Sequence, residues 1–120
     1  MSRNKCIFCS IVETSSAEIF YEDEKTLAIK PLHPVIEGHI LVLPKQHFEN
    51  ILDINTDLLL HITDVAQSIA RKLILDTNAT GINVLHAAGK DAQQSVSHFH
   101  YHIVPRLSGD GLDLWLKNNL

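Results

Sequence analysis

The alternation of hydrophobic and polar residues predicts five short strands along this chain. The candidate segments are EIFYE (18–22), TLAIK (26–30), HILVLP (39–44), GINVLHA (81–87) and VSHFHYHIV (96–104). An acidic DEK turn separates the first two segments and favours a hairpin between them. Because proline cannot donate a main-chain hydrogen bond, we expect Pro44 and Pro105 to end the third and fifth strands.

Between Asn55 and Asp76, apolar residues recur at the spacing of one long helix. They are Leu58, Leu59, Ile62, Val65, Ala66, Ile69, Ala70, Leu73 and Ile74. Asn55, Thr56 or Asp57 can cap its first turn. Closely spaced strands at both ends of the chain, with this helix between them, indicate an α+β fold. We expect an antiparallel sheet with the helix on one face.

Proline, glycine and small polar residues mark the connecting segments. Residues 31–38 (PLHPVIEG) and 88–95 (AGKDAQQS) are typical of loops. The tail LDLWLKNNL (112–120) fits core, helix or interface equally well. No internal repeat or flexible linker divides the sequence, so we expect residues 1–120 to form a single domain.

The composition agrees with a folded core and argues against some partners. Hydrophobic residues make up 45% of the chain, and the formal net charge is -4. Such a chain has no overall positive field for nucleic acid or an anionic membrane surface. Residues 1–16 hold only a brief apolar patch, too short for a signal peptide or a membrane span. We expect a cytoplasmic protein without nucleic-acid or membrane partners.

Two cysteines form the first candidate for chemistry. Cys6 and Cys9 stand in a C-x-x-C motif, which in an intracellular chain indicates redox or metal chemistry before a structural disulfide. A thiolate pair suits zinc, although two ligands do not complete a tetrahedral site. Zinc is favoured because no thioredoxin-like strand-then-helix pattern surrounds the pair. A redox dithiol and two unmetallated thiols remain the alternatives.

The second candidate is the segment HFHYHIVPR (98–106), which holds three of the eight histidines. On a strand, His98, His100 and His102 share one face, and Phe99, Tyr101 and Ile103 share the other. We expect the aromatic face to be core. Three aligned imidazoles favour a metal site or nucleophilic catalysis over an ordinary half-exposed polar face.

The order of these motifs resembles the histidine triad (HIT) family, and in particular its Hint-like branch. CIFCSIV opens the chain, YEDEKTLAIKPLHPVIEGHILVLPKQH fills its first half, and GKDAQQSVSHFHYHIVPR lies near its end. The resemblance covers nearly the whole chain. It implies a sheet of about five antiparallel strands, one long helix, a short helix, and a homodimer in which the sheet continues from one copy to the next.

The resemblance also implies hydrolysis at the α-phosphorus of a nucleoside monophosphate ester or amide. His100 would attack the phosphorus and form a nucleotidyl-histidine, while the main-chain carbonyl of His98 fixes its tautomer. His102 would contact the phosphate, and His39 would support the site from the neighbouring strand. His39 can also be an ordinary core histidine. A histidine at position 102 favours a hydrolase over a nucleotidyl transferase, which typically has glutamine there.

The same resemblance implies how a nucleotide, AMP-like or GMP-like, would be bound. Ser95, Gln94 and Gly89 belong to the phosphate-side loop, where Ser95 can also assist the leaving group. Leu32 and Ile29 resemble the apolar walls beside the base, although both can equally be core.

Three positions depart from the family pattern. Pro31 replaces an acidic residue that grips the ribose, Ala87 replaces an asparagine ahead of the loop glycine, and Gln93 replaces a glycine. These changes weaken the expectation of ordinary adenosine substrates. A non-catalytic nucleotide-binding or protein-binding module therefore remains an alternative.

In relatives with the same N-terminal C-x-x-C, zinc is completed by two histidines that match His47 and His98. The resemblance thus implies a closed structural zinc site of Cys6, Cys9, His47 and His98. A structural zinc protein whose histidines mainly hold metal is the third alternative. His33 and His86 receive no role, and we expect His61 on the exposed side of the long helix.

Overall fold

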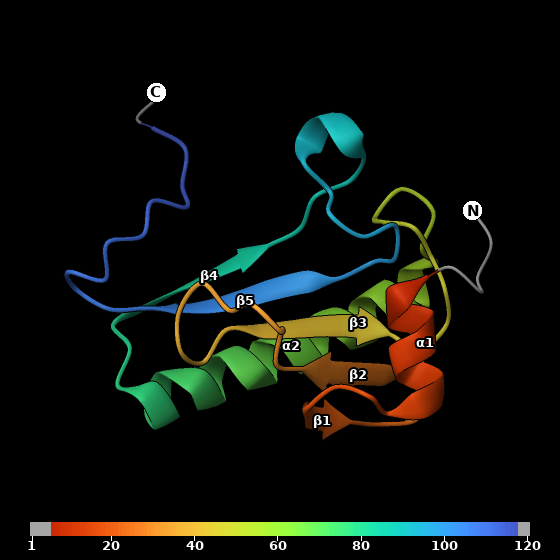
Figure 1. The fold of residues 1–120 in the computed structure, drawn as a ribbon, viewed down its shortest axis with the longest axis horizontal. Helices are drawn as coiled ribbons and strands as arrows, with labels where there is room; N and C mark the ends of the chain where they lie inside the picture. Colours follow the sequence, from red (N-terminus) through yellow and green to blue (C-terminus); the bar gives the residue numbers. More distant parts are fainter. Residues whose placement is uncertain (1–5, 118–120) are drawn as a thin grey trace.

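The computed structural model describes residues 6–117, which form two α-helices, a short 3-10 turn and five strands (Figure 1). The elements are α1 (Ile7–Thr14), β1 (Ile19–Glu22), β2 (Thr26–Ile29), β3 (Ile40–Pro44), α2 (Thr56–Thr77), β4 (Gly81–Leu85), the 3-10 turn η2 (Lys90–Ala92) and β5 (Tyr101–Arg106). Four of the five predicted strands and the long helix lie where the pattern placed them, within about two residues at either end.

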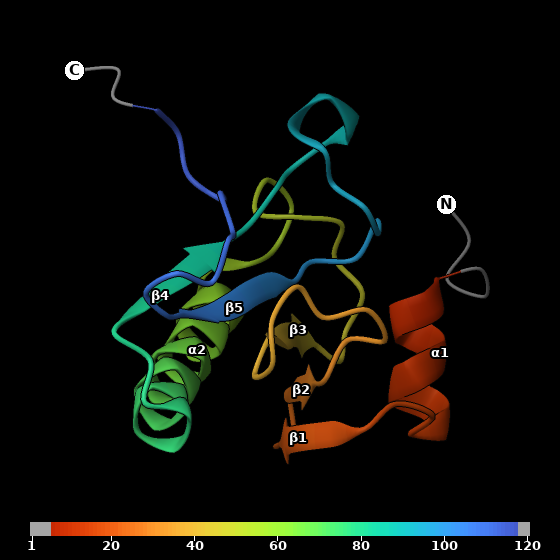
Figure 2. The ribbon, with the colours of Figure 1, turned by 60° about the vertical axis from the view of Figure 1, so that its left-hand side comes forward.

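The five strands form one sheet in the order β1-β2-β3-β5-β4, and every neighbouring pair is antiparallel. Figure 2 shows α2 on one side of the strands and α1 on the other. The predicted α+β fold, an antiparallel sheet with the long helix on one face, is confirmed. None of the helices in residues 6–117 is long and apolar enough to cross a membrane.

Alternate residues of the central strands supply two separate apolar clusters. On the α2 side, Ala28, Ile40, Val42, Phe99 and Ile103 pack with the apolar stripe of the helix. On the opposite side, Leu27, Ile29, Leu41 and Leu43 pack with Cys6, Phe8 and Cys9. The central strands β2 and β3 are therefore buried on both faces.

The long helix begins and ends at polar caps. The Asn55 side-chain oxygen accepts a hydrogen bond from the Leu58 N–H at 2.9 Å, and Asn78 adopts the left-handed conformation at the other end. An N-cap of this kind is typically worth about 1 kcal/mol. The choice among Asn55, Thr56 and Asp57 is thus resolved in favour of Asn55.

The predicted strand 96–104 is wrong at both ends, since β5 runs from Tyr101 to Arg106 and includes Pro105. Pro105 pairs with Ile82 of β4, but the β3 partner ends at Ile40, opposite Ile103. On the β3 side Pro105 therefore faces the loop at Gly38, where its missing N–H costs no ladder bond. A Cβ atom built on Gly38 would lie 3.0 Å from the Pro105 ring.

A proline also explains why β5 begins as late as Tyr101. Continuing the β3–β5 register from the pair Val42 and Tyr101 would place Pro44 opposite Phe99. Pro44 has no N–H to donate, so the paired part of β5 begins only at Tyr101. His98 and His100 thus precede the strand instead of lying within it.

The C-terminal segment after β5 is held through Arg106. Its guanidinium donates to the Asp110 carboxylate, to the Asn83 side-chain oxygen and to the main-chain oxygen of Leu112. Residues 112–117 form neither helix nor strand, and Trp115 is exposed. The rest of the tail, residues 118–120, and the N-terminal residues 1–5 lie outside the described part of the chain.

Candidate active site and metal centre

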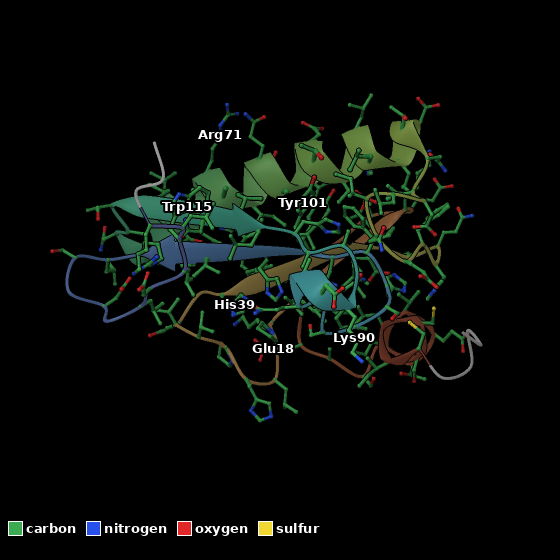
Figure 3. The ribbon with its side chains drawn as sticks, turned by 90° about the horizontal axis from the view of Figure 1, so that it is seen from above. Glu18, His39, Arg71, Lys90, Tyr101 and Trp115 are labelled. Carbon is green, nitrogen blue, oxygen red and sulfur yellow. The ribbon has the colours of Figure 1, made fainter. Side chains whose placement is uncertain are left out.

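The three histidines of the predicted row lie on the sheet face away from α2. In Figure 3, Arg71 projects from α2 on one side of the sheet, whereas His39 and Lys90 lie on the other. His98 is fully buried, His100 is 6% exposed and His102 is half-buried. The predicted division of faces is confirmed, since Phe99 and Ile103 are fully buried in the cluster beneath α2.

His100 is held as a neutral imidazole with one defined tautomer. Its Nδ1 lies 2.8 Å from the main-chain oxygen of His98, and a carbonyl oxygen can only accept, so Nδ1 carries the proton. Burial lowers the pKa of His100, and the nearby His86 lowers it further, against the hydrogen bond to the His98 carbonyl. The Nε2 lone pair is therefore available for bonding to an electrophile.

Phe8 of α1 covers part of this imidazole. Its ring meets the His100 ring edge-on, with the centroids 5.1 Å apart, and meets the His98 ring at 5.7 Å. Phe8 leaves only a small edge of His100 in contact with solvent and lowers the polarity around it. Such a partly desolvated ring favours the neutral, nucleophilic form of imidazole.

His102 and His39 form a second, linked pair. The Val35 N–H donates to His39 Nδ1 at 3.2 Å, so the His39 proton is on Nε2. That nitrogen lies 3.0 Å from His102 Nδ1, and His102 in turn carries its proton on Nε2. His102 thus presents an N–H donor while it is neutral.

Burial favours the uncharged form of both rings of this pair, and the neighbouring histidines add to this effect at His102. Burial, followed by the proximity of His100 and His39, lowers the pKa of His102 to about 4. Burial also lowers the pKa of His39. The row therefore combines one lone pair, on His100, with one neutral donor, on His102.

Four side chains from distant parts of the chain form a compact donor cluster. Cys6 and Cys9 come from the start of α1, His47 from the loop after β3, and His98 from the segment before β5. Their ligand atoms all lie within 4.8 Å of one another. These four residues could hold one metal ion.

The distances in this cluster fit a tetrahedral ion. Cys6 Sγ lies 3.3 Å from His98 Nδ1, and Cys9 Sγ lies 3.2 Å from His47 Nδ1 and 3.6 Å from His98 Nδ1. Bonds of about 2.3 Å to sulfur and about 2.0 Å to nitrogen in tetrahedral geometry separate such atoms by about 3.5 Å.

The second nitrogen of His98 orients its ring for this cluster. His98 Nε2 donates to the main-chain oxygen of Pro44 at 2.8 Å, so Nδ1 keeps its lone pair toward the sulfur atoms. A hydrogen bond of this kind is typical of metal-binding histidines. Because the His98 carbonyl also accepts from His100, one residue connects the donor cluster to the candidate nucleophile.

The predicted phosphate-side loop is braced by Gln94. Its amide nitrogen donates to the main-chain oxygens of Glu49 and Val96, and its oxygen accepts from the Gly89 N–H and the Asn50 side chain. All the amide hydrogens are thus used inside the protein. These hydrogen bonds of Gln94 fix the conformation of the loop. The neighbouring Ser95 is exposed and does not stabilise the loop in this way.

Gln93 occupies a backbone conformation that glycine normally takes. Its φ is 70°, at the end of the η2 turn, and Gly89 at the start of that turn has a φ of 94°. For a residue with a Cβ atom this left-handed conformation costs about 1–2 kcal/mol. The departure from glycine at this position therefore leaves local strain in the loop.

The other predicted binding residues lie in different surroundings. Leu32 is 88% exposed on the loop between β2 and β3, where Pro31 is half-buried. Ile29 is 2% exposed, in the apolar cluster beneath α1. Ala87 is half-buried at the start of the phosphate-side loop.

Two contacts were missed by the sequence reasoning. His86 donates from Nδ1 to the main-chain oxygen of His100 at 3.0 Å, although it received no role. His61 was expected to be exposed but is half-buried, with Nε2 at 2.9 Å from the Asp23 carboxylate. A lone histidine at a strand end or on a helix gives no local pattern that reveals such distant partners.

Comparison with known proteins agrees with this arrangement. A family model described as the HIT domain matches residues 13–109. The chain is 40% identical over 109 residues to the Bacillus subtilis protein named Protein hit. The matched region covers 88% of this chain and 74% of the relative. It is 36% identical over 111 residues to a Candida albicans protein named adenosine 5'-monophosphoramidase, covering 88% of this chain and 72% of the relative.

A solved structure shares both the fold and the sequence. A zinc-bound histidine triad family protein from Mycobacterium smegmatis superposes with a TM-score of 0.87 and 36% identity, over 98% of this chain and 86% of that one. The cluster of Cys6, Cys9, His47 and His98 is consistent with the Hint-like branch. The chain therefore belongs to the histidine triad (HIT) family.

Proposed function

We propose that this protein hydrolyses nucleoside monophosphate esters or amides at the α-phosphorus, in the manner of a nucleoside phosphoramidase. The observation that carries the proposal is the state of His100, whose Nδ1 donates to the His98 carbonyl and whose Nε2 keeps a lone pair. The name of the Candida albicans relative, adenosine 5'-monophosphoramidase, supports the substrate class.

The proposed reaction has two displacements at phosphorus. In the first, His100 Nε2 bonds to phosphorus, and the bond from phosphorus to the leaving nitrogen or oxygen breaks. The leaving group takes the hydroxyl proton of Ser95, while His102 stays neutral and assists as a hydrogen-bond donor. In the second, water bonds to phosphorus, the bond to Nε2 breaks and the proton lost by water returns to Ser95, which releases the nucleoside monophosphate and returns His100 to its neutral form.

The surrounding residues would bind and orient the nucleotide. His102, kept neutral, donates its Nε2–H to a phosphate oxygen, and His39 holds it in that tautomer. Main-chain N–H groups near Ser95 add to the phosphate contacts, and Gln94 accepts the Gly89 N–H and so fixes the loop. Leu32 would cover one side of the base, and Ile29 would support it from the core.

We also propose that the donor cluster binds zinc in a structural role. Two thiolates and two imidazoles are the donor set that zinc prefers, and four protein ligands leave no open position for water. The Mycobacterium smegmatis relative is zinc-bound, which supports the choice of metal. Bound zinc would neutralise the thiolates and join α1 to the segment that precedes β5.

The test of catalysis is intact-mass measurement after brief mixing with adenosine 5'-phosphoramidate. The wild-type protein should gain the mass of one adenylyl group, and His100→Ala should not. Turnover in His100→Ala should fall by roughly a thousandfold or more, because the nucleophile is gone. His33→Ala is the matched control, since His33 lies on an exposed loop, and it should retain both adduct and turnover.

The alternatives give different results. A wild-type protein that binds the nucleotide but forms no adduct and has no turnover would be a binding module instead. An adduct that persists in His100→Ala would assign the nucleophile to another residue. If the protein binds zinc but no nucleotide, the structural zinc protein is the alternative that remains.

A further inference from the structure

His86 lies behind the candidate nucleophile, on the opposite face of the sheet. Its ring stacks on Phe99, with centroids 4.4 Å apart and planes at 27°, and meets Tyr101 edge-on at 5.9 Å. Phe99 and Tyr101 belong to the cluster beneath α2, whereas His100 points to the other face. His86 therefore cannot touch a substrate bound at His100.

Both ring nitrogens of His86 have main-chain partners. Nδ1 donates to the His100 carbonyl at 3.0 Å, and Nε2 accepts from the Ile51 N–H at 3.1 Å. A carbonyl requires a donor and an N–H requires an acceptor, so only the neutral ring with its proton on Nδ1 satisfies both. The side chain joins three segments: the end of β4, the loop before α2 and the start of β5.

The residues that carry the nucleophile lie outside the paired part of the sheet. Tyr101 is the first residue of β5 with a register partner in β3, and His102 is the first with a partner in β4. Residues 98–100 are held by other contacts, such as the 2.6 Å hydrogen bond from the Phe99 N–H to the Phe48 carbonyl. The His86 contact falls on the one residue whose orientation matters most for attack.

We propose that His86 is a positioning residue that fixes the main chain of His100 and thereby aims its imidazole at phosphorus. The His98 carbonyl fixes the ring from one side, and His86 fixes the peptide that carries the ring from the other. This inference rests on the proposed function, because it assigns to His86 the alignment of that nucleophile. A small misalignment slows an in-line displacement without weakening substrate binding.

Three substitutions separate the contacts of His86. His86→Asn places an amide N–H near the former Nδ1 and keeps the donor to the His100 carbonyl. His86→Gln places its amide near the former Nε2 and favours the contact to the Ile51 N–H. His86→Phe keeps the ring stacking on Phe99 and removes both hydrogen bonds.

In steady-state kinetics with adenosine 5'-phosphoramidate, kcat should be higher in variants that keep the hydrogen bond to the His100 carbonyl than in variants that lose it. We expect roughly a tenfold loss of kcat in His86→Phe and a similar loss in His86→Gln, with KM changed less than about twofold. His86→Asn should recover most of the kcat. The control is Thr63→Val, which removes the 3.0 Å hydrogen bond from α2 to the Tyr101 hydroxyl on the same face and should leave kcat unchanged.

A second measurement does not depend on activity. Imidazole ¹⁵N spectra of the wild-type protein should show the Nδ1–H tautomer for both His86 and His100. In His86→Phe, the His100 signals should shift or broaden, and His86→Asn should restore them. This spectroscopic change reports the orientation of His100 even if one variant is less stable than the others.

The outcomes distinguish this inference from the proposed function. Wild-type kcat together with unchanged His100 signals in His86→Phe would overturn the positioning role and leave the hydrolase intact. The wild-type protein could form no adduct while the His100 signals are still perturbed in His86→Phe. That result would overturn the proposed hydrolase and retain the structural link between His86 and His100. Equal losses of kcat in His86→Asn and His86→Phe would also overturn the assignment to the His100 carbonyl.

Discussion

At the scale of residues, identical side chains in one motif acquire different states from their hydrogen-bond partners. His98 donates from Nε2 to the Pro44 carbonyl, whereas His100 donates from Nδ1 to the His98 carbonyl. His102 is set by His39, which is itself set by the Val35 N–H. The three rings thus offer a ligand nitrogen, a lone pair and a donor.

The state of His102 predicts how stability depends on pH. Its folded pKa of about 4 lies below the value of about 6.5 expected in the unfolded chain. The unfolded chain therefore binds more protons between these two values, and the free energy of unfolding should decrease as pH falls from 6.5 toward 4. Denaturant titrations across this range should show a smaller decrease in His102→Gln.

A direct measurement on the His102 ring separates its titration from that of other groups. NMR titration of the His102 ring should give a midpoint well below the ordinary histidine value of about 6.5. A His102 midpoint close to that of an ordinary surface histidine would contradict this prediction.

Local patterns of residues could be predicted from the sequence, but contacts between distant residues could not. The alternation of His98, His100 and His102 was predictable because strand geometry is local. The contacts of His86 and His61 were not, because the partners of His86 lie 14 and 35 positions away along the chain and the partner of His61 lies 38 positions away. Only the folded sheet brings these groups together.

At the scale of elements, the short strands were predictable because turns and prolines bound them. The exception is β5, whose limits depend on where β3 begins and ends. Pro105 lies inside a strand because the loop at Gly38 replaces a strand partner on that side. No property of the segment 96–106 alone contains this information.

The donor cluster adds to the apolar packing that attaches α1 to the sheet. This eight-residue helix buries only Phe8 and Cys9, and a helix of that length is not stable alone in water. Removing metal with a chelator should therefore lower the melting temperature by more than roughly 5 °C. Calorimetry before and after chelation, with zinc stoichiometry by atomic absorption, provides the measurement.

Cys6→Ser serves as the matched variant in this experiment. It should bind less than one equivalent of zinc and should lose its response to the chelator, while Ser10→Ala on the same helix should behave as wild type. Full stability of the metal-free protein would argue against the structural role of zinc.

At the scale of the whole molecule, the sheet ends in β1 and β4, each of which has one edge without a partner strand among residues 6–117. In β4, Val84 is 45% exposed, and the tail beyond β5 exposes Trp115. An apolar edge strand of this kind is typical of a surface that pairs with another copy. We expect a homodimer in which β4 strands extend the sheet across two chains.

Light scattering after gel filtration tests this expectation. The mass in solution should be twice the chain mass of 13.4 kDa. Val84→Lys should shift the mass toward one chain, and Leu75→Lys, on an exposed position of α2, is a control for added surface charge. A wild-type protein of single-chain mass would contradict the dimer.

The alternation around His100 has a final consequence for how this segment can change over time. The odd positions Phe99, Tyr101 and Ile103 contribute to the hydrophobic interior, while the even positions carry the imidazoles. Deleting a single residue within this segment would move the residues on one side of the deletion to the opposite face, which places imidazoles beneath α2 and exposes aromatic rings. Evolution can therefore replace individual side chains here far more easily than it can alter the length of the segment.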